Sequence, residues 1–472
     1  MVEEQVRRGD EVIQYRQAHF IGIGGYGMSA LARVLLAKGV KVSGSDLARK
    51  DLIDKLEQLG AQVYIGHRRE QVDGADVVVY SSDIPQDNVE LTEAVRRQIP
   101  LLHRSQMLAQ ILNHQTGIAV AGTHGKTTTA SMIARVLEVG GLDPTYIIGG
   151  ELLDVGSNAR AGDSPYVVAE ADESDGTFLQ YVPFMAVVTN LEADHLENYD
   201  GDFNKLVGAY RQFLSQIKPG GLAVINVDDP HLRSFLPSLD CSVCTYSLHD
   251  TSADLVAVDI RTNGWGSVYR AVFRGDDWGE ITLSVPGRHN VSNSLAALLI
   301  GRSLGLSLSD MAAALSTFHG AKRRFEVIAE VDGIMFVDDY AHHPTEIAAT
   351  LEAARGLNRR VVALFQPHRY SRTDDLKEAF GSAFAGADEV WVTEIYSPKG
   401  DERRPISGRD LVELIRQKSN RNAHYAADLH ELVQQVLPRL SAGDLVLTMG
   451  AGDIWQVARW LPDALSHKPA KG

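Results

Sequence analysis

Cysteine is scarce in this sequence, since only Cys241 and Cys244 occur among 472 residues. Their CxxC spacing suits a redox motif, but such a motif normally lies at a strand-to-helix turn, and residues 241–247 have the pattern of a strand. A zinc site needs more ligands than two thiols, and only His249 is close in sequence. We therefore expect two buried or half-buried thiols without redox or metal chemistry.

Long apolar runs and an excess of basic residues are also lacking. No stretch of about 18 apolar residues occurs, so we predict no membrane span. The first eight residues contain no apolar segment of the kind found in signal peptides, and we expect a cytoplasmic protein. The formal net charge is −15, from 46 basic and 61 acidic residues, which argues against nucleic acid as the main partner. Basic side chains should instead gather where an anionic substrate binds.

The order of predicted elements indicates three successive α/β regions without repeats. A chain of 472 residues suggests two to four domains of about 100–200 residues each. Strands that alternate with helices predict parallel sheets. Strands are predicted at residues 18–21, 41–43, 77–82, 117–121, 166–169, 185–189, 222–226, 361–365, 389–393 and 445–448. Helices are predicted at 28–38, 130–137, 290–304, 345–355 and 407–418, and residues 255–285 are rich in strand formers.

The most informative motif is a glycine-rich turn between a predicted strand and a predicted helix. It consists of Gly122, Thr123, His124, Gly125, Lys126, Thr127 and Thr128. Backbone N–H groups of such a turn close on phosphates, the lysine reaches the terminal phosphates, and a threonine hydroxyl can hold Mg²⁺. The full P-loop pattern has another glycine where Val120 stands, so an ordinary strand-to-helix turn is the alternative. That alternative explains the glycines but not the lysine with its threonines, and we predict a nucleoside triphosphate site.

A second glycine-rich turn follows the first predicted strand. Gly22, Gly24 and Gly27 form G-x-G-x-x-G, Gly25 lies within it, and Asp46 ends the next strand. This is the dinucleotide fingerprint, in which the acid holds a ribose hydroxyl, and alone it indicates an NAD-dependent dehydrogenase. The physics requires only a pyrophosphate at a helix N-terminus, and any nucleoside diphosphate carries one. Because a separate triphosphate turn is present, hydride transfer is the less favoured interpretation.

Other polar residues also stand where predicted strands end. Glu170 is the Mg²⁺ ligand expected beside a P-loop, whereas a solvated loop is the alternative for the acids that follow it. His195 follows the next strand and is a candidate second metal ligand, although a lone histidine is usually structural.

Two further groups of polar residues lie in the last third of the chain. Asn290 and Asn293 open a predicted helix and suit an adenine edge or phosphates, with helix capping by Asn290 as the alternative. His342 follows a strand of the third region, and Arg369 and Arg372 follow the next one. Ligands of parallel sheets bind at such strand ends, and two arginines suit a carboxylate or phosphate.

Taken together, these motifs resemble the Mur ligase family. The resemblance rests on residues 122–128, 170–175, 194–195, 288–293, 322–326, 338–346 and 365–370, which occur in the family's order. The joint match is specific, although the single motifs are not. It implies an α/β protein of three domains. These would be a Rossmann-like domain at 1–115, a central P-loop ATPase-like domain with a mostly parallel sheet at 116–321, and a C-terminal Rossmann-like domain at 322–472.

The resemblance also implies an ATP-dependent ligation in two steps. The lactyl carboxylate of UDP-N-acetylmuramic acid would attack the γ-phosphate of ATP, and the amine of L-alanine would then displace phosphate from the acyl phosphate. The implied cofactors are ATP and two Mg²⁺ ions, and the implied partners are the sugar nucleotide and L-alanine. We expect no nucleic-acid partner, no membrane insertion, and a monomer or weak dimer.

Site residues follow from the resemblance position by position. The implied catalytic residues are Lys126, Glu170 and His195, and the implied metal ligands are Thr127, Glu170 and His195. ATP would contact the turn 122–128 together with Asn290, Asn293, Arg324 and Asp339. The sugar nucleotide would contact Gly22, Gly24, Gly25, Gly27, Asp46 and Ser81. L-alanine would contact His342, Arg369 and Arg372.

Alternatives remain open within this interpretation. Several relatives that add later residues carry a carbamylated lysine after the Asp-His motif, whereas residues 208–214 contain no lysine, which agrees with the member that adds L-alanine. The nearest competitor is a recycling ligase that attaches a preformed tripeptide to the same sugar nucleotide. Residues 365–370 favour the single amino acid. An NAD-dependent dehydrogenase is a distant alternative.

Overall fold

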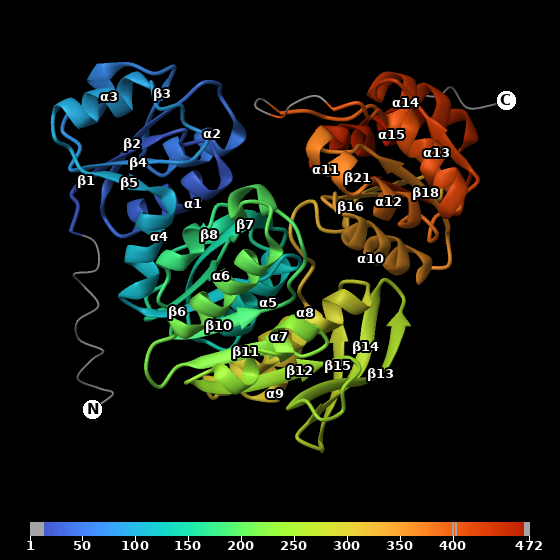
Figure 1. Cartoon of the computed structure of the whole chain (residues 1–472), viewed down its shortest axis with the longest axis horizontal. Helices are drawn as coiled ribbons and strands as arrows, with labels where there is room; N and C mark the ends of the chain where they lie inside the picture. The colour runs from blue at the N-terminus through green and yellow to red at the C-terminus, as the bar shows by residue number, and fades with distance from the viewer. Residues whose placement is uncertain (1–13, 399–400, 402–403, 467–472) are drawn as a thin grey trace. The chain divides into compact units, whose positions relative to one another are not determined.

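The computed structural model describes residues 14–398, 401 and 404–466, which form two compact units (Figure 1). The first unit contains the described residues up to Val258 together with 270–281 and 292–318. The second contains 259–269, 282–291 and the described residues from His319 onward. The segment on which the signal-peptide expectation rests lies outside the described residues. The predicted α/β class is confirmed, while the domain boundaries at 115/116 and 321/322 stay predictions.

The first sheet is a parallel sheet with the strand order β3-β2-β1-β4-β5. Its strands are β1 (Gln17–Ile21), β2 (Lys41–Asp46), β3 (Gln62–Ile65), β4 (Val77–Tyr80) and β5 (Leu101–His103). The helices that alternate with them are α1 (Tyr26–Ala37), α2 (Asp51–Gln58), α3 (Val89–Arg96) and α4 (Arg104–Asn113). Residues 77–79 of β4 are fully buried, as expected for a parallel strand covered on both faces. Because β1 is the central strand of this order, the glycine turn that follows it lies at the middle of the sheet.

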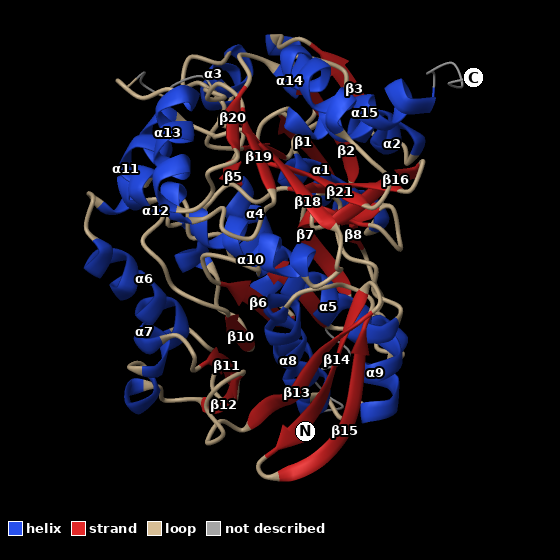
Figure 2. Ribbon diagram, turned by 90° about the vertical axis from the view of Figure 1, so that its right-hand side faces the viewer, coloured by secondary structure: helices blue, strands red, loops and turns tan. Residues whose placement is uncertain are grey.

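The second sheet has ten strands in the order β15-β14-β13-β12-β11-β10-β6-β9-β7-β8. The strands are β6 (Thr116–Ala121), β7 (Thr145–Leu152), β8 (Ser157–Arg160), β9 (Tyr166–Glu170), β10 (Met185–Val188), β11 (Leu222–Asn226), β12 (Ser242–Ser247), β13 (Leu255–Asn263), β14 (Gly266–Phe273) and β15 (Asp276–Leu283). Helices α5 (Lys126–Val139), α6 (Phe203–Ser215), α7 (Pro230–Arg233), α8 (Arg288–Ser303) and α9 (Leu308–Ser316) connect or follow them. The run from β12 to β7 is parallel, and β8 is antiparallel to β7. Figure 2 shows β13, β14 and β15 as neighbouring long strands, in the region predicted to be rich in strand.

The third sheet has the order β16-β17-β21-β18-β19-β20, and only its β16–β17 pair is antiparallel. Its strands are β16 (Glu326–Val331), β17 (Ile334–Asp339), β18 (Arg360–Phe365), β19 (Glu389–Val392), β20 (Ala423–Tyr425) and β21 (Asp444–Met449). Its helices are α10 (Pro344–Arg355), α11 (Tyr370–Asp375), α12 (Lys377–Ser382), α13 (Gly408–Lys418), α14 (Leu429–Val436) and α15 (Val457–Ser466). Local start signals in the sequence explain where helix α10 begins. His343 is its N-cap, Pro344 is its first residue, and Glu346 completes a capping box.

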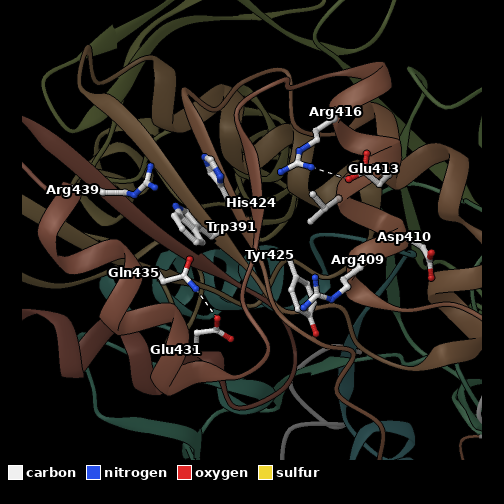
Figure 3. A pocket seen from close by; sticks show the side chains of 11 residues that line it. Trp391, Arg409, Asp410, Glu413, Arg416, His424, Tyr425, Glu431, Gln435 and Arg439 are labelled. Carbon is white, nitrogen blue, oxygen red and sulfur yellow. Dashed lines mark hydrogen bonds and ion pairs between the residues drawn. The ribbon is translucent and has the colours of Figure 1, made fainter.

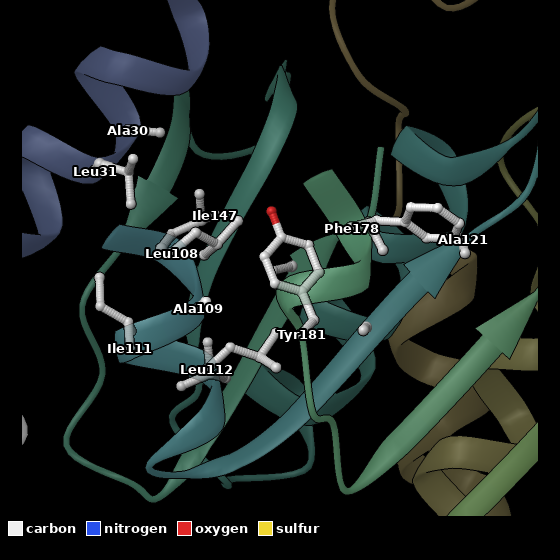
Figure 4. Packing of buried hydrophobic residues seen from close by; sticks show 14 of the residues in the cluster. Ala30, Leu31, Leu108, Ala109, Ile111, Leu112, Ala121, Ile147, Phe178 and Tyr181 are labelled. Atoms are coloured by element: carbon white, nitrogen blue, oxygen red, sulfur yellow. The ribbon is translucent and has the colours of Figure 1, made fainter. Parts of the chain in front are cut away.

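A shared core joins the first sheet to the triphosphate turn within the first unit. Side chains of α1, α4 and β7 pack together with Tyr181 and Phe178 in one buried cluster (Figure 4). Leu31 and Leu108 come from the first sheet's helices, whereas Ile147 comes from the second sheet. Burial of each such side chain stabilises the fold by about 1.5–3 kcal/mol. The two glycine turns therefore belong to one packed body.

Two expectations from composition can be compared with the fold. Cys244 in β12 and Cys241 just before this strand are free and half-buried, as predicted, and burial raises the pKa of both thiols. Within the described part of the chain, every helix is too short or too polar to span a bilayer.

Candidate active site

The end of β2 holds the glycine turn between β1 and α1 in place by hydrogen bonds. The backbone N–H groups of Gly22 and Ile23 donate to Ser45 O at 2.8 and 3.0 Å, and Gly24 N donates to Asp46 Oδ2 at 3.0 Å. A Cβ on Gly24 would lie 2.8 Å from that carboxylate oxygen, so a larger residue would displace Asp46 from the turn. No side chain caps the start of α1 at Gly25, and the N-terminus of a helix is a favourable position for an anion. Asp46 thus lies at the turn, as the fingerprint predicts.

The turns after β4 and β5 complete this end of the first sheet. Ile84 Cδ1 is 3.1 Å from the Cβ position on Gly22, so the turn containing Ser81 lies beside the glycines. Arg104 Nη1 lies 3.4 Å from the Cβ position on Gly27. The motif reasoning missed Arg104, although it directly follows β5 and the strand-end rule could have found it.

The triphosphate turn is shaped by two glycines and held by the end of β10. Gly122 has φ +135° and Gly125 has φ +82°, both outside the range of ordinary L residues. His124 N donates to Asn190 Oδ1 at 2.8 Å, and the Thr189 hydroxyl donates to His124 O at 2.6 Å. Helix α5 begins at Lys126, earlier than predicted, because left-handed Gly125 serves as its N-cap.

Asn293 lies at this turn. Its Oδ1 would lie 2.8 Å from a Cβ on Gly125, so the amide is in close contact with the phosphate cradle. Asn290 belongs to the other unit and donates from Nδ2 to Pro286 O at 2.7 Å. Since α8 begins at Arg288, Asn290 lies inside the helix and is not its N-cap.

Thr127 and Glu170, the two predicted metal ligands, are in direct contact. Thr127 Oγ1 donates to Glu170 Oε2 at 3.1 Å, and Gly149 N donates to Glu170 Oε1 at 2.6 Å. A hydroxyl and a carboxylate at this distance fit the oxygen donors that Mg²⁺ prefers. His195 has a left-handed backbone (φ 55°), and its ring lies 3.6 Å from Asp194 and 3.8 Å from Glu197. Its role at a second metal position stays a prediction.

Lys126 is paired with a carboxylate that the motif reasoning did not assign. Its Nζ lies 2.8 and 3.0 Å from the two carboxylate oxygens of Glu173, which is buried. Burial opposes the charge on Lys126, but Glu173 and Asp172 outweigh it and raise the pKa of the ammonium. Asp172 and Asp175, expected in a solvated loop, are partly exposed and lie 3.7 and 3.9 Å from Arg104. The acidic loop therefore faces both glycine turns.

In the second unit, Asp339 ends β17 as a buried carboxylate. It accepts hydrogen bonds from Phe325 N at 2.8 Å and Ala341 N at 2.7 Å. Burial raises the pKa of Asp339 to about 6, against the positive charge of Arg324. Arg324 lies over the ring of Tyr340 at 5.3 Å. The predicted pair Arg324 and Asp339 is thus brought together at one strand end.

The residues predicted to contact an amino acid gather around His368. The rings of His342 and His368 are 6.1 Å apart, and His368 stacks on Tyr396 at 5.7 Å. Burial, together with the positive charges of Arg372 and Arg369, lowers the pKa of His368 to about 4. This histidine is therefore neutral near pH 7, and the positive charge beside it belongs to the two arginines. The sequence motifs did not single out His368 and Tyr396 as candidate site residues.

Replacing His368 with glutamine is expected to weaken the loss of stability on acidification. The pKa of His368 is about 4 in the folded chain against an ordinary 6.5, so the unfolded chain binds this proton more readily. The stabilisation is complete above pH 6.5 and is lost as the pH falls toward 4. About 2 kcal/mol of this loss should disappear in His368→Gln, as measured by urea unfolding at pH 7 and pH 4.5. An unchanged difference between the two pH values would contradict the assignment.

The second unit also has a surface pocket of about 470 Å³ between α13, α14 and the strands β19 and β20 (Figure 3). Arg409 covers the ring of Tyr425 at 4.2 Å, and Arg416 pairs with Glu413 at 2.7 Å. The charged lining residues are Arg409, Arg416, Arg439, Asp410, Glu413 and Glu431. Their charges balance, so the pocket favours no anion, and it contains none of the predicted site residues.

Comparison with known proteins identifies the family. Residues 17–116 match the model described as Mur ligase family, catalytic domain, and residues 120–301 match the Mur ligase middle domain. Residues 323–452 match the Mur ligase, glutamate ligase domain. The chain belongs to the Mur ligase family. The resemblance predicted from the motifs is thereby confirmed.

Individual relatives place this Mur ligase more closely. It is 50 % identical over 465 residues to a UDP-N-acetylmuramate–L-alanine ligase of Symbiobacterium thermophilum, covering 97 % of this chain and 96 % of the relative. Among solved structures, a UDP-N-acetylmuramate-alanine ligase of Thermotoga maritima matches with a TM-score of 0.80 at 30 % identity, over 95 % of this chain and 99 % of the other. A murein peptide ligase of Psychrobacter arcticus matches with a TM-score of 0.70 at 26 % identity, over 96 % and 100 %.

Proposed function

We propose that this Mur ligase joins L-alanine to the lactyl carboxylate of UDP-N-acetylmuramic acid, with ATP and an acyl-phosphate intermediate. The observation that carries the proposal is the arrangement of Lys126, Thr127 and Glu170 at the ends of the adjacent strands β6 and β9. The two substrates are those in the name of the relative that is 50 % identical to this chain. We place the reaction in the cytoplasm, with two Mg²⁺ ions and a monomeric or weakly dimeric enzyme.

In the proposed first step, a carboxylate oxygen of the sugar nucleotide attacks the γ-phosphorus of ATP. The bond from that phosphorus to the β–γ bridging oxygen breaks, so ADP leaves and the acyl phosphate remains. Lys126 balances the charge on the transferred group, since phosphoryl transfer depends on positioning and charge neutralisation. Thr127, Glu170 and His195 would hold Mg²⁺, which neutralises phosphate charge when bound.

In the proposed second step, the amine nitrogen of L-alanine attacks the acyl carbon. The bond from that carbon to the phosphate oxygen breaks, inorganic phosphate leaves, and the extra proton on the nitrogen passes to the departing phosphate. Arg369 and Arg372 would hold the amino-acid carboxylate by charge-assisted hydrogen bonds, with His342 beside them. Because His368 is neutral near pH 7, the arginines would provide the positive charge that holds the carboxylate.

The remaining predicted residues would bind the two nucleotides. The N–H groups at the start of α1 suit the diphosphate of the sugar nucleotide, with Asp46 on the ribose and Ser81 beside the turn. ATP would contact the turn 122–128 through backbone N–H groups. Asn290, Asn293, Arg324 and Asp339 are proposed for its adenine, ribose and phosphates.

The two alternatives receive less support. A recycling ligase for a preformed tripeptide would share the sugar-nucleotide site, but the match to the murein peptide ligase has lower identity and TM-score than that to the alanine ligase. An NAD-dependent dehydrogenase would have no use for the pair of Thr127 and Glu170 beside a lysine.

The proposal is tested by phosphate release from ATP in the presence of Mg²⁺ and UDP-N-acetylmuramic acid. We expect release only when L-alanine is also present. Parallel reactions contain the tripeptide in place of L-alanine, or no acceptor. Release with the tripeptide alone would move the chain to the recycling ligases. No release in any reaction would contradict the ligase function.

A further inference from the structure

All hydrogen-bonding capacity of the Lys126 ammonium is engaged by its own turn and by the acidic loop after β9. Its Nζ lies 2.6 Å from Gly122 O and 3.2 Å from Thr123 O, besides 2.8 and 3.0 Å from the two oxygens of Glu173. An ammonium has three N–H donors, and these four acceptors satisfy all of them. A terminal phosphate can therefore reach this lysine only by replacing one of its present partners.

Glu173 is the one charged group among those partners, and it is firmly placed. Its side chain is 2 % exposed, and that of Lys126 is 15 % exposed. The Tyr199 hydroxyl donates to Glu173 O at 2.5 Å, and Gly176 N donates to the same oxygen at 3.0 Å. The backbone at Glu173 is thus fixed from two sides, while its carboxylate presents both oxygens to the ammonium, as phosphate oxygens would.

The other charged groups around the pair do not replace this contact. Asp172 is the next carboxylate along the loop, and it lies toward Arg104 at 3.7 Å. Glu170 accepts hydrogen bonds from Thr127 and Gly149 through its two oxygens. Glu173 is therefore the acid that competes directly with phosphate for Lys126.

We propose that Glu173 is a positioning residue that latches the Lys126 ammonium through its carboxylate and exchanges places with the terminal phosphates of ATP. The inference rests on the proposed function only in taking ATP as the ligand of this loop. In the latched state the ammonium is withheld from the phosphate site. Binding of the triphosphate releases it, so the lysine becomes available only when its substrate is present.

The test is the affinity for MgATP without sugar nucleotide or L-alanine, measured by titration calorimetry. Glu173→Gln keeps the size of the side chain but removes its charge. If the latched state holds about 80–90 % of the molecules, this variant should bind MgATP about five- to tenfold more tightly. Glu173→Asp retains the charge and should stay within about threefold of the unaltered protein. AMP, which lacks the terminal phosphates, should bind both equally.

A double-variant cycle separates the latch from simple charge repulsion. In a Lys126→Ala background, Glu173→Gln should change the MgATP affinity less than about twofold, because there is no lysine to release. Asp254→Asn, at a carboxylate of the same unit bound to Thr245, is the matched control and should leave the affinity unaltered. In turnover, Glu173→Gln should lower KM for ATP without raising kcat.

Several outcomes would overturn the latch. One is that Glu173→Gln binds MgATP no more tightly than the unaltered protein. Another is that Glu173→Gln raises the MgATP affinity equally with and without Lys126. Because no acceptor is present, a failed ligase assay with normal MgATP binding would contradict the proposed function and leave the latch standing. If the ligase is active and Glu173→Gln binds MgATP with unaltered affinity, the latch is contradicted and the proposed function stands. Failure of the unaltered protein to bind MgATP would overturn both.

Discussion

Lys126→Ala is expected to lower the kcat of phosphate release by about 1000-fold, because the transferred phosphoryl group loses its balancing charge. The chain should still fold. Removal of the ammonium leaves Glu173 buried without a counter-charge, but burial already raises the pKa of this carboxyl, which can take up a proton. The loss of stability should therefore stay below the 3–5 kcal/mol that is typical when one partner of a buried ion pair is removed. Phosphate release and urea unfolding measure the two effects.

A double variant is the control for this result. Lys126→Ala with Glu173→Gln removes both charges, so it should recover stability relative to Lys126→Ala while remaining inactive. Activity above one tenth of the original in Lys126→Ala would mean that the turn is not the phosphate site.

Gly122→Ala is expected to have the second largest effect. The backbone at Gly122 has φ +135°, which a residue with a Cβ adopts only under strain. The added Cβ would lie 2.0 Å from Thr189 Oγ1, whose hydroxyl holds the turn through His124 O. Strain and steric overlap should lower the free energy of unfolding by about 3 kcal/mol. The displaced turn should weaken MgATP binding about 100-fold, as measured by calorimetry.

Gly208→Ala is the matched control in the same unit. Gly208 lies in α6, and a Cβ there would meet no atom within 4 Å. An alanine in a helix interior is favoured over glycine by about 0.5–1 kcal/mol, so this variant should be slightly more stable and bind MgATP normally. If Gly122→Ala behaved like Gly208→Ala, the shape of the turn would not matter for binding.

Local sequence rules succeeded where strand, turn and helix follow one another directly. The turn after β6, the pair of Thr127 with Glu170, and Asp46 beside the first glycine turn all follow from the rule that parallel strands end at one edge. Glu173 lies in a loop, where no periodicity shows which side chain is buried. The contact of Arg104 with Asp172 joins residues far apart in sequence, and nothing local encodes it.

The hairpin of β7 and β8 shows a second reason for a missed element. Gly149 weakens the strand pattern of β7, since glycine in a strand interior usually marks a break or a close approach. Here it is a close approach. A Cβ on Gly149 would lie 3.0 Å from Glu170 Oε2, and its N–H donates to Glu170 Oε1 at 2.6 Å. The residue that obscured the strand helps to place the carboxylate.

The position of β6 between β9 and β10 has a consequence for how such ligases diversify. Backbone pairing sets Val120 opposite Glu170 and Ala121 opposite Val188, so inter-strand hydrogen bonds fix the spacing of the residues proposed for the ATP site. The residues proposed for L-alanine lie on the strand ends of another sheet and another unit. Substitutions among the residues proposed for L-alanine leave the backbone frame of the proposed ATP site unchanged. A fold built in this way can acquire a new acceptor by altering one module, with its chemistry for activating carboxylates inherited intact.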